Sequence, residues 1–255
     1  MGNPTFVLIP GAWHTPTAYE PVKSILEGDG FECATVSLPS VGCKPVTYDF
    51  SEDVEAVRNT VLKLVDGGKE VVVVMHSYSG MCGSEALKSL SKDERVAQGL
   101  SGGVVRLVYI MAMILPEGSE PAPRGTTDNM HPFMVADLEA GIVTVSPEDA
   151  LKVFYNDFPS AQAQEFASQI EPQSIGVFYS KITYAPWRAI PTTYVLCEND
   201  QSFTMAYADY LLSVAKSTDD HKIDTLERCD AGHFVMVSKP EWLADVLKRA
   251  AGAYM

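Results

Sequence analysis

The chain has 255 residues, enough for one large α/β domain or two small ones with a substantial buried core. Its 46% apolar and 20% charged residues are typical of a soluble globular protein. No apolar run approaches the roughly 18 residues that indicate a membrane-spanning helix. The formal net charge of −14 disfavours nucleic acid and anionic membrane surfaces. We therefore expect neither nucleic acid nor a membrane among its partners.

The amino terminus and the cysteines both indicate a reducing compartment. No basic segment precedes the apolar run at residues 6–9, which is too short for a signal peptide. The five cysteines are an odd set without a C-x-x-C pair, as is typical of free thiols. These features predict a cytoplasmic protein. Because no His, Cys and carboxylate residues have metal-ligand spacing, we expect no metal, and we expect no other cofactor.

The first half of the chain alternates between strand and helix patterns. In chain order, they are a strand at 5–9, a helix at 17–28, a strand at 31–36, a helix at 51–65, a strand at 71–75, a helix at 81–88 and a strand at 104–111. Asp49 or Ser51 is the expected N-cap of the helix that ends near residue 65. Residues 91–103 are expected to be a polar surface connection.

The valine-rich strand runs directly into Met75-His76-Ser77-Tyr78-Ser79-Gly80 and then into a helix pattern. A strand, a sharp turn and a helix that meet at a serine are typical of a nucleophile elbow, G-x-S-x-G. Met75 and Ser79 replace its two glycines, so an ordinary strand-to-helix connection is the alternative. Ser79 is the rival nucleophile. If the motif were centred on Ser79, Met81 would occupy a position that requires a small residue, so the sequence favours Ser77.

The alternation stops between residues 115 and 187. Several prolines open this stretch, and short helix patterns follow at 147–154 and 160–170. We expect residues 1–114 and 188–255 to form the core and residues 115–187 to form a lid above the sheet edge. Aromatic side chains of the lid are candidates for the wall of an apolar substrate pocket, with packing inside the lid as the alternative. They are Phe133, Phe154, Phe158, Tyr184 and Trp187.

Strand and helix patterns resume after the lid, at 192–197, 203–215, 222–226 and from residue 240 onward. Together with the first half they predict a doubly wound, mostly parallel sheet of about six strands, with the ligand site beyond its carboxyl ends. Ser77, Asp200 and His233 all follow strand ends. A serine hydroxyl is a weak nucleophile that needs a base within reach and a carboxylate to orient that base. These three residues are therefore the candidate catalytic site.

Four short segments carry a resemblance to a known superfamily. They are 6–13 (FVLIPGAW), 75–80 (MHSYSG), 197–200 (CEND) and 232–234 (GHF). These segments resemble the α/β-hydrolase superfamily, and most closely its compact branch that includes plant methylesterases and hydroxynitrile lyases. The resemblance covers about residues 5–112 and 190–250. It implies an α/β-hydrolase fold, with Ser77 as the nucleophile, His233 as general base and then acid, and Asp200 as the orienting carboxylate.

The same resemblance implies an oxyanion hole formed by the backbone amides of Ala12 and Tyr78. The branch has His-Gly where this chain has Pro10-Gly11, which changes the side chains of the loop but not its backbone. Three further residues near these positions are candidates for the pocket wall or for structural packing. They are Trp13, His14 and Phe234.

At two positions the sequence differs from related enzymes, and each difference disfavours a type of reaction. Hydroxynitrile lyases of this branch carry a lysine directly after the catalytic histidine, where this chain has Phe234, and epoxide hydrolases carry an aspartate where it has Ser77. Cleavage of a small or medium apolar ester, lactone or thioester through an acyl-enzyme remains. The alternatives are a C–C lyase, cyclase or eliminase that uses His233 as its base, and a ligand receptor, which an intact triad disfavours. The sequence also leaves a homodimer open.

Overall fold

Six strands form the central sheet of the protein. The computed structural model describes residues 2–253, and within them the strand order is β2-β1-β3-β4-β8-β9, with every neighbouring pair parallel. The strands are β1 (Thr5–Ile9), β2 (Cys33–Thr35), β3 (Glu70–His76), β4 (Gly103–Ile110), β8 (Thr192–Cys197) and β9 (Ile223–Cys229). Both faces of β3 are covered, so its valines at 71–74 are fully buried. The predicted doubly wound sheet of about six strands is confirmed.

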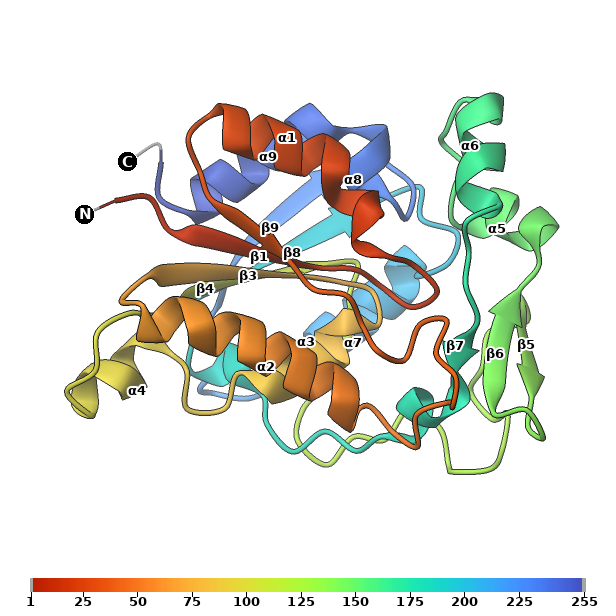
Figure 1. Cartoon of the computed structure of the whole chain (residues 1–255), viewed down its shortest axis with the longest axis horizontal. Coiled ribbons are helices and arrows are strands. Elements are labelled where there is room, and N and C mark those ends of the chain that lie inside the picture. The colour runs from red at the N-terminus through yellow and green to blue at the C-terminus, as the bar shows by residue number, and fades with distance from the viewer. Residues whose placement is uncertain (1, 254–255) are drawn as a thin grey trace.

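Helices cover both faces of this sheet (Figure 1). On one face lie α1 (Glu20–Gly28), α8 (Val235–Ser238) and α9 (Pro240–Ala250), and on the other lie α2 (Ser51–Asp66), α3 (Ser79–Ala86) and α7 (Met205–Lys216). In α2, the residues at 53, 57, 61 and 65 are buried because a spacing of four keeps them on the face that meets the sheet. This arrangement leaves the carboxyl edge of the sheet free for the loops that carry the site.

An N-cap and one additional helix differ from the expectations. The N-cap of α2 is Phe50, and neither Asp49 nor Ser51 has that role: Asp49 Oδ1 instead accepts a hydrogen bond from the Ser51 amide at 2.8 Å. A helix, α4 (Lys92–Ala97), occupies part of the stretch expected to be a polar connection. Its capping box joins Ser91 and Glu94, an S-x-x-E signal that is visible in the sequence.

Residues 115–187, here called the lid segment, lie largely beyond the carboxyl edge of the sheet, on the opposite side from the two ends of the chain (Figure 1). Within the described residues they contain a small antiparallel sheet and two helices. The elements are β5 (Met134–Asp137), β6 (Ile142–Val145), β7 (Gln173–Ser174), α5 (Pro147–Val153) and α6 (Ser160–Ala167). Both helices match the predicted patterns. The sheet was not predicted, because strands of two to four residues are too short for alternation to show.

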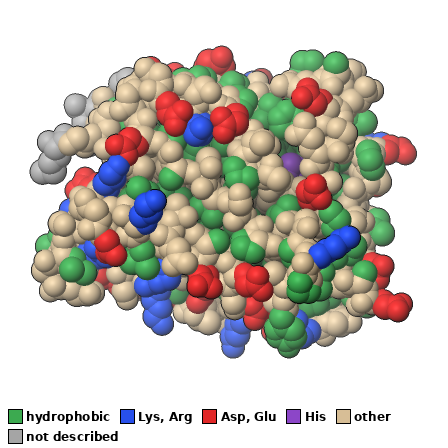
Figure 2. Space-filling model, viewed as in Figure 1, with side chains coloured by type: hydrophobic (Ala, Val, Ile, Leu, Met, Phe, Trp, Pro, Cys, Tyr) green, Lys and Arg blue, Asp and Glu red, His purple; other side chains and the backbone are tan. Residues whose placement is uncertain are grey.

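Short 3-10 turns complete the chain: η1 (Pro16–Tyr19), η2 (Ile175–Tyr179) and η3 (Pro186–Arg188). Acidic and basic side chains are interspersed on the face shown in Figure 2, and the described part of that face has no continuous area of Lys and Arg. A polyanion would therefore find no basic patch there. Among residues 2–253, no helix has both the length and the apolar character needed to cross a membrane.

Candidate active site

Ser77 lies in the sharp turn between β3 and α3. Its φ angle is +55°, in the left-handed region that costs a non-glycine residue free energy and that strained functional turns use. Two backbone hydrogen bonds hold the turn against the end of β4 and the segment that follows it. The Ser77 amide donates to the Ile110 carbonyl at 3.2 Å, and the Met113 amide donates to the Ser77 carbonyl at 3.1 Å. The turn places Ser77 at the carboxyl edge of the sheet, where it lines a cavity.

Met75 stands where an elbow normally has a small residue, and Gly83 in α3 compensates for it. A Cβ atom added to Gly83 would lie 2.7 Å from Sδ and 2.8 Å from Cγ of Met75, which is fully buried. The missing side chain of Gly83 therefore makes room for the methionine. Gly80 allows a second close approach, because a Cβ there would lie 2.6 Å from the carbonyl oxygen of Met113. The small residues that the elbow requires are supplied by the helix instead of the strand.

Ser79, the rival nucleophile, has a structural position. Its side chain is fully buried, and its Oγ accepts a hydrogen bond from the His76 amide at 2.8 Å. The same hydroxyl lies 3.0 Å from the Ile9 carbonyl oxygen and 2.9 Å from the His76 carbonyl oxygen, to either of which it can donate. Ser79 therefore joins β1 to the elbow, and Ser77 is the serine of the pair that borders open space.

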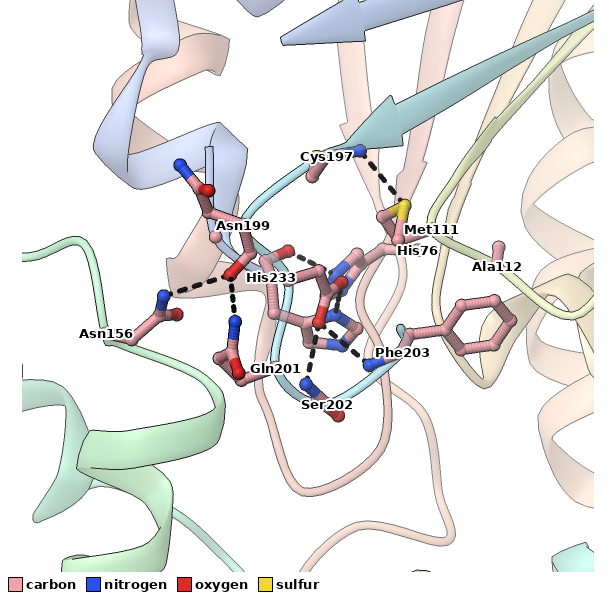
Figure 3. A network of polar contacts seen from close by, with 12 residues as sticks. His76, Met111, Ala112, Asn156, Cys197, Asn199, Gln201, Ser202, Phe203 and His233 are labelled. Carbon is pink, nitrogen blue, oxygen red and sulfur yellow. Dashed lines mark hydrogen bonds and ion pairs between the residues drawn. The ribbon is translucent and has the colours of Figure 1, made fainter. Parts of the chain in front are cut away.

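Asp200 and His233 form a buried hydrogen-bonded pair. His233 Nδ1 lies 2.6 Å from Asp200 Oδ2, and the other carboxylate oxygen accepts hydrogen bonds from the amides of Ser202 and Phe203, both at 2.8 Å (Figure 3). This pairing places a proton on Nδ1 and leaves Nε2 as the basic nitrogen. Ser77 and His233 line the same narrow space, which is the arrangement that general-base activation of the hydroxyl requires.

Two further histidines surround this pair, and both have structural partners. His76 Nε2 donates to the His233 carbonyl oxygen at 2.9 Å, and the two rings lie 4.5 Å apart between centroids. His14 is held by the Ala12 carbonyl oxygen at 2.7 Å and by the Tyr155 hydroxyl at 2.5 Å. Burial lowers the pKa of His14 to about 4 and that of His76 well below its ordinary value, so both are neutral near pH 7.

The loop after β1 approaches the elbow closely. A Cβ on Gly11 would lie 3.0 Å from His76 Nδ1 and 3.1 Å from the Ser77 Cβ, so glycine suits this position. Ala12 and Tyr78 line the cavity together with Ser77, which is where the two expected oxyanion donors need to be. Ala12 belongs to the loop after β1 and Tyr78 to the turn between β3 and α3.

Trp13 anchors that loop to the lid segment. Its backbone has a φ of +64°, its amide donates to Gln173 Oε1 at 3.2 Å, and its indole Nε1 donates to the Val143 carbonyl oxygen at 3.0 Å. The Trp13 carbonyl in turn accepts the Glu171 amide at 3.1 Å. Strained backbone of this kind persists only where surrounding contacts determine it, and here the lid segment supplies them.

A buried polar chain links this loop to the elbow. Gln173 Nε2 donates to Ser40 Oγ at 2.6 Å, Ser40 Oγ donates to Asp53 Oδ2 at 2.6 Å, and the Tyr78 hydroxyl donates to the same Asp53 oxygen at 2.6 Å. Burial raises the pKa of the Asp53 carboxyl, and hydrogen bonds from Ser40 and Tyr78 oppose that rise. Sequence reasoning missed Asp53, although it lies four residues before Val57 and hence on the buried face of α2.

The Ser77 cavity has a volume of about 100 Å³ and walls that are mostly apolar. Trp13 and Phe133 of the predicted wall residues line it. Three others, His14, Phe154 and Phe234, line its narrow end beside His233. Three predicted wall residues line neither space: Phe158, Tyr184 and Trp187. Phe158 packs on Tyr155 and Phe166, and Tyr184 is partly buried at another place in the structure. Trp187 is fully buried, and its indole donates a hydrogen bond to the Leu115 carbonyl oxygen.

The lid segment also contacts the loops that carry the acid and the histidine. Asp157 Oδ2 accepts the Gly232 amide at 2.7 Å, directly before His233. Asn156 Nδ2 donates to the Asn199 carbonyl oxygen at 3.0 Å, and the Gln201 side chain donates to the same oxygen at 3.1 Å (Figure 3). The contacts from Asn156 and Asp157 therefore hold the loops of Asp200 and His233 from outside the central sheet. Within residues 2–253, no group of three or more His, Cys, Asp or Glu side chains could hold a metal ion.

Comparison with known proteins identifies the family of this chain. A family model described as "Alpha/beta hydrolase family" matches residues 6–246. "Alpha/beta hydrolase nvfD" of Aspergillus novofumigatus is 31% identical over 99% of this chain and 98% of that protein, and an "Alpha-hydroxynitrile lyase" of Arabidopsis thaliana is 22% identical over 98% of each. The crystal structure of methylesterase MES16 from Arabidopsis has a TM-score of 0.73, with 20% identity over 98% of this chain and 99% of that chain. The predicted resemblance is confirmed, and the chain belongs to the alpha/beta hydrolase family.

Proposed function

We propose that the protein is a serine hydrolase that cleaves a small or medium, largely apolar ester, lactone or thioester. The observation that carries the proposal is the strained Ser77, which shares one narrow space with a histidine whose other ring nitrogen is bound to a buried carboxylate. A left-handed backbone costs a non-glycine residue free energy. A nucleophile in such a turn gains exposure of its hydroxyl and access to nearby backbone donors.

The residues suggest the following sequence of steps. His233 Nε2 takes the Ser77 proton as Oγ attacks the substrate carbonyl, and the Ala12 and Tyr78 amides stabilise the negative oxygen that forms. Asp200 holds the proton on Nδ1 and stabilises the imidazolium. His233 then gives its proton to the leaving oxygen or sulfur, and the C–O or C–S bond breaks to leave an acyl-enzyme. A water activated by His233 hydrolyses this ester and restores Ser77.

Phe234 supports hydrolysis over cyanohydrin cleavage. Its ring is 1% exposed and packs 4.3 Å from His14 and 4.9 Å from His76, between ring centroids. The position directly after the catalytic histidine therefore lies in a closed aromatic cluster and offers no ammonium group to a departing cyanide. The apolar walls of the cavity favour an apolar acyl or aryl portion in the substrate.

The test is labelling with a fluorophosphonate probe followed by mass spectrometry, with Ser77→Ala and Ser79→Ala beside the parent. We expect labelling and turnover of a simple aryl ester in the parent, and loss of both in Ser77→Ala. The Ser79→Ala variant should still be labelled, because the Ser79 hydroxyl of the parent is hydrogen-bonded to the backbone and does not act as the nucleophile. A parent that neither labels nor cleaves any ester would overturn the hydrolase assignment in favour of elimination or ring-forming chemistry that uses His233 as its base.

A further inference from the structure

His131 and Tyr207 stand at the boundary between two adjoining spaces. Both line the Ser77 cavity, and both also line an outer groove whose walls include the apolar side chains of Leu115 and Leu211. A substrate with its reacting group at Ser77 and its tail in the groove would therefore run past both side chains. His131 comes from the lid segment and Tyr207 from α7, so both parts of the chain contribute to the boundary.

The polar atoms of these two side chains are available to a ligand. Neither ring nitrogen of His131 nor the hydroxyl of Tyr207 hydrogen-bonds another residue of the described range 2–253. The imidazole stacks on Phe133, with 5.3 Å between centroids and 9° between planes, and meets the Tyr207 ring edge-on at 6.2 Å. Stacking fixes the plane of the imidazole. Its nitrogens lie in that plane and therefore point to the side, away from Phe133.

The electrostatic setting selects a neutral ligand group. Burial lowers the pKa of His131, and the nearby His233 lowers it further while Asp200 opposes this shift. The lowered pKa favours the neutral ring, which offers one donor and one acceptor. In the part of the chain that the structure describes, no Lys or Arg lines either space, and the groove contains Glu120. An anionic ligand group would lack a counter-charge. A purely hydrocarbon ligand would bury both side chains without a hydrogen-bond partner, which is unfavourable.

We propose that His131 and Tyr207 bind a second, neutral oxygen of the substrate, a ketone or hydroxyl placed between the reacting carbonyl and an apolar tail. This inference rests on the proposed function, since it takes the reacting carbonyl to be an ester, lactone or thioester at Ser77. The His131 N–H and the Tyr207 O–H both donate to a ketone oxygen. The apolar tail lies in the outer groove against Leu115 and Leu211. The substrate class is a neutral keto or hydroxy ester with a hydrophobic tail.

A set of p-nitrophenyl octanoates tests this subsite directly. One ester is unsubstituted, and in the others a single ketone is moved along the chain. We expect the parent to have a kcat/KM about tenfold higher for at least one keto ester than for the plain ester, the discrimination typical of one neutral hydrogen bond. His131→Phe and Tyr207→Phe should each remove most of that preference, because they keep the ring and delete the polar atoms.

Matched controls separate the subsite from general effects of the substitutions. Tyr48 is 73% exposed, and His221 precedes β9 at the opposite end of the sheet from the site. Tyr48→Phe and His221→Phe should keep the parent's preference for the keto ester. The proposal would be overturned if the parent showed no preference within the set, or if both site variants kept it with an unchanged circular dichroism spectrum.

Failure of the subsite can be told apart from failure of the proposed function. Fluorophosphonate labelling and turnover of the plain ester report on Ser77 alone. If neither labelling nor turnover is seen, the same esters are titrated calorimetrically into the Ser77→Ala variant. They are also titrated into two double variants, which combine Ser77→Ala with His131→Phe or with Tyr207→Phe. A tighter dissociation constant for a keto ester that is lost in the double variants would support the subsite without hydrolysis, and equal dissociation constants would overturn it.

Discussion

Replacing Gly83 by alanine isolates the contact that lets this chain keep a methionine at position 75. The new Cβ would lie 2.7 Å from Met75 Sδ, well inside normal contact distance. Because Met75 is fully buried, the overlap must be relieved by shifts in a packed core, at a cost of about 1–3 kcal/mol. Alanine in a helix gains about 1 kcal/mol over glycine, which offsets part of that cost. We expect Gly83→Ala to lower the free energy of unfolding by up to about 2 kcal/mol.

The effect should change sign once the methionine is shortened. Met75→Ala costs about 2–5 kcal/mol by itself, but it removes the overlapping sulfur. In that background Gly83→Ala should raise the free energy of unfolding by about 1 kcal/mol. Urea denaturation followed by circular dichroism measures all four proteins, and we expect a coupling of about 1–3 kcal/mol.

Gly28 provides the matched control, because it also lies in a helix and a Cβ added there would meet nothing within 4 Å. Gly28→Ala should have the same effect with Met75 and with alanine at position 75. An equal effect of Gly83→Ala in the two backgrounds would refute the reasoning. Packing between positions 75 and 83 would then have no part in the stability of the elbow.

Three further predictions concern single side chains of the site. Asp200→Asn presents an amide to His233 Nδ1 and selects the wrong tautomer, so kcat for an aryl ester should fall about 10⁴-fold with an unchanged circular dichroism spectrum. Tyr78→Phe removes a hydrogen bond to a buried carboxyl and should lower the free energy of unfolding by about 1–3 kcal/mol; no change in urea denaturation would contradict this. The folded-state pKa of His14 is lowered to about 4, so the unfolded chain binds a proton first as the pH falls below 6.5. Stability should therefore decrease from pH 6.5 towards pH 4, by about 3 kcal/mol from this group, and His14→Gln but not His221→Gln should flatten the pH profile of urea denaturation.

Local patterns in the sequence were sufficient for the core of this fold. A run of four valines predicts a strand buried on both faces, and the structure has it at the centre of the sheet. Since parallel strands bring their carboxyl ends to one edge, the order of Ser77, Asp200 and His233 along the chain was enough to expect them at a common site. These inferences depend only on neighbours in sequence and on the handedness of crossovers, which are insensitive to details of packing.

Contacts between distant segments were decided only by the tertiary structure. The chain from Gln173 through Ser40 and Asp53 to Tyr78 joins residues up to 133 positions apart, and no local pattern encodes it. The sequence already favoured Ser77 over Ser79, and the structure adds that the Ser79 hydroxyl is hydrogen-bonded to the backbones of β1 and β3.

The lid segment is the least predictable part for the same reason. Its helices follow local patterns, but which of its aromatic side chains reach the cavity depends on how it packs over the sheet edge. Phe133 and Phe154 reach the Ser77 cavity or its narrow end, whereas Trp187, which is also apolar, is fully buried elsewhere. The apolar character of these side chains favours contact with other apolar groups. Only the three-dimensional arrangement of the chain determines which groups they contact.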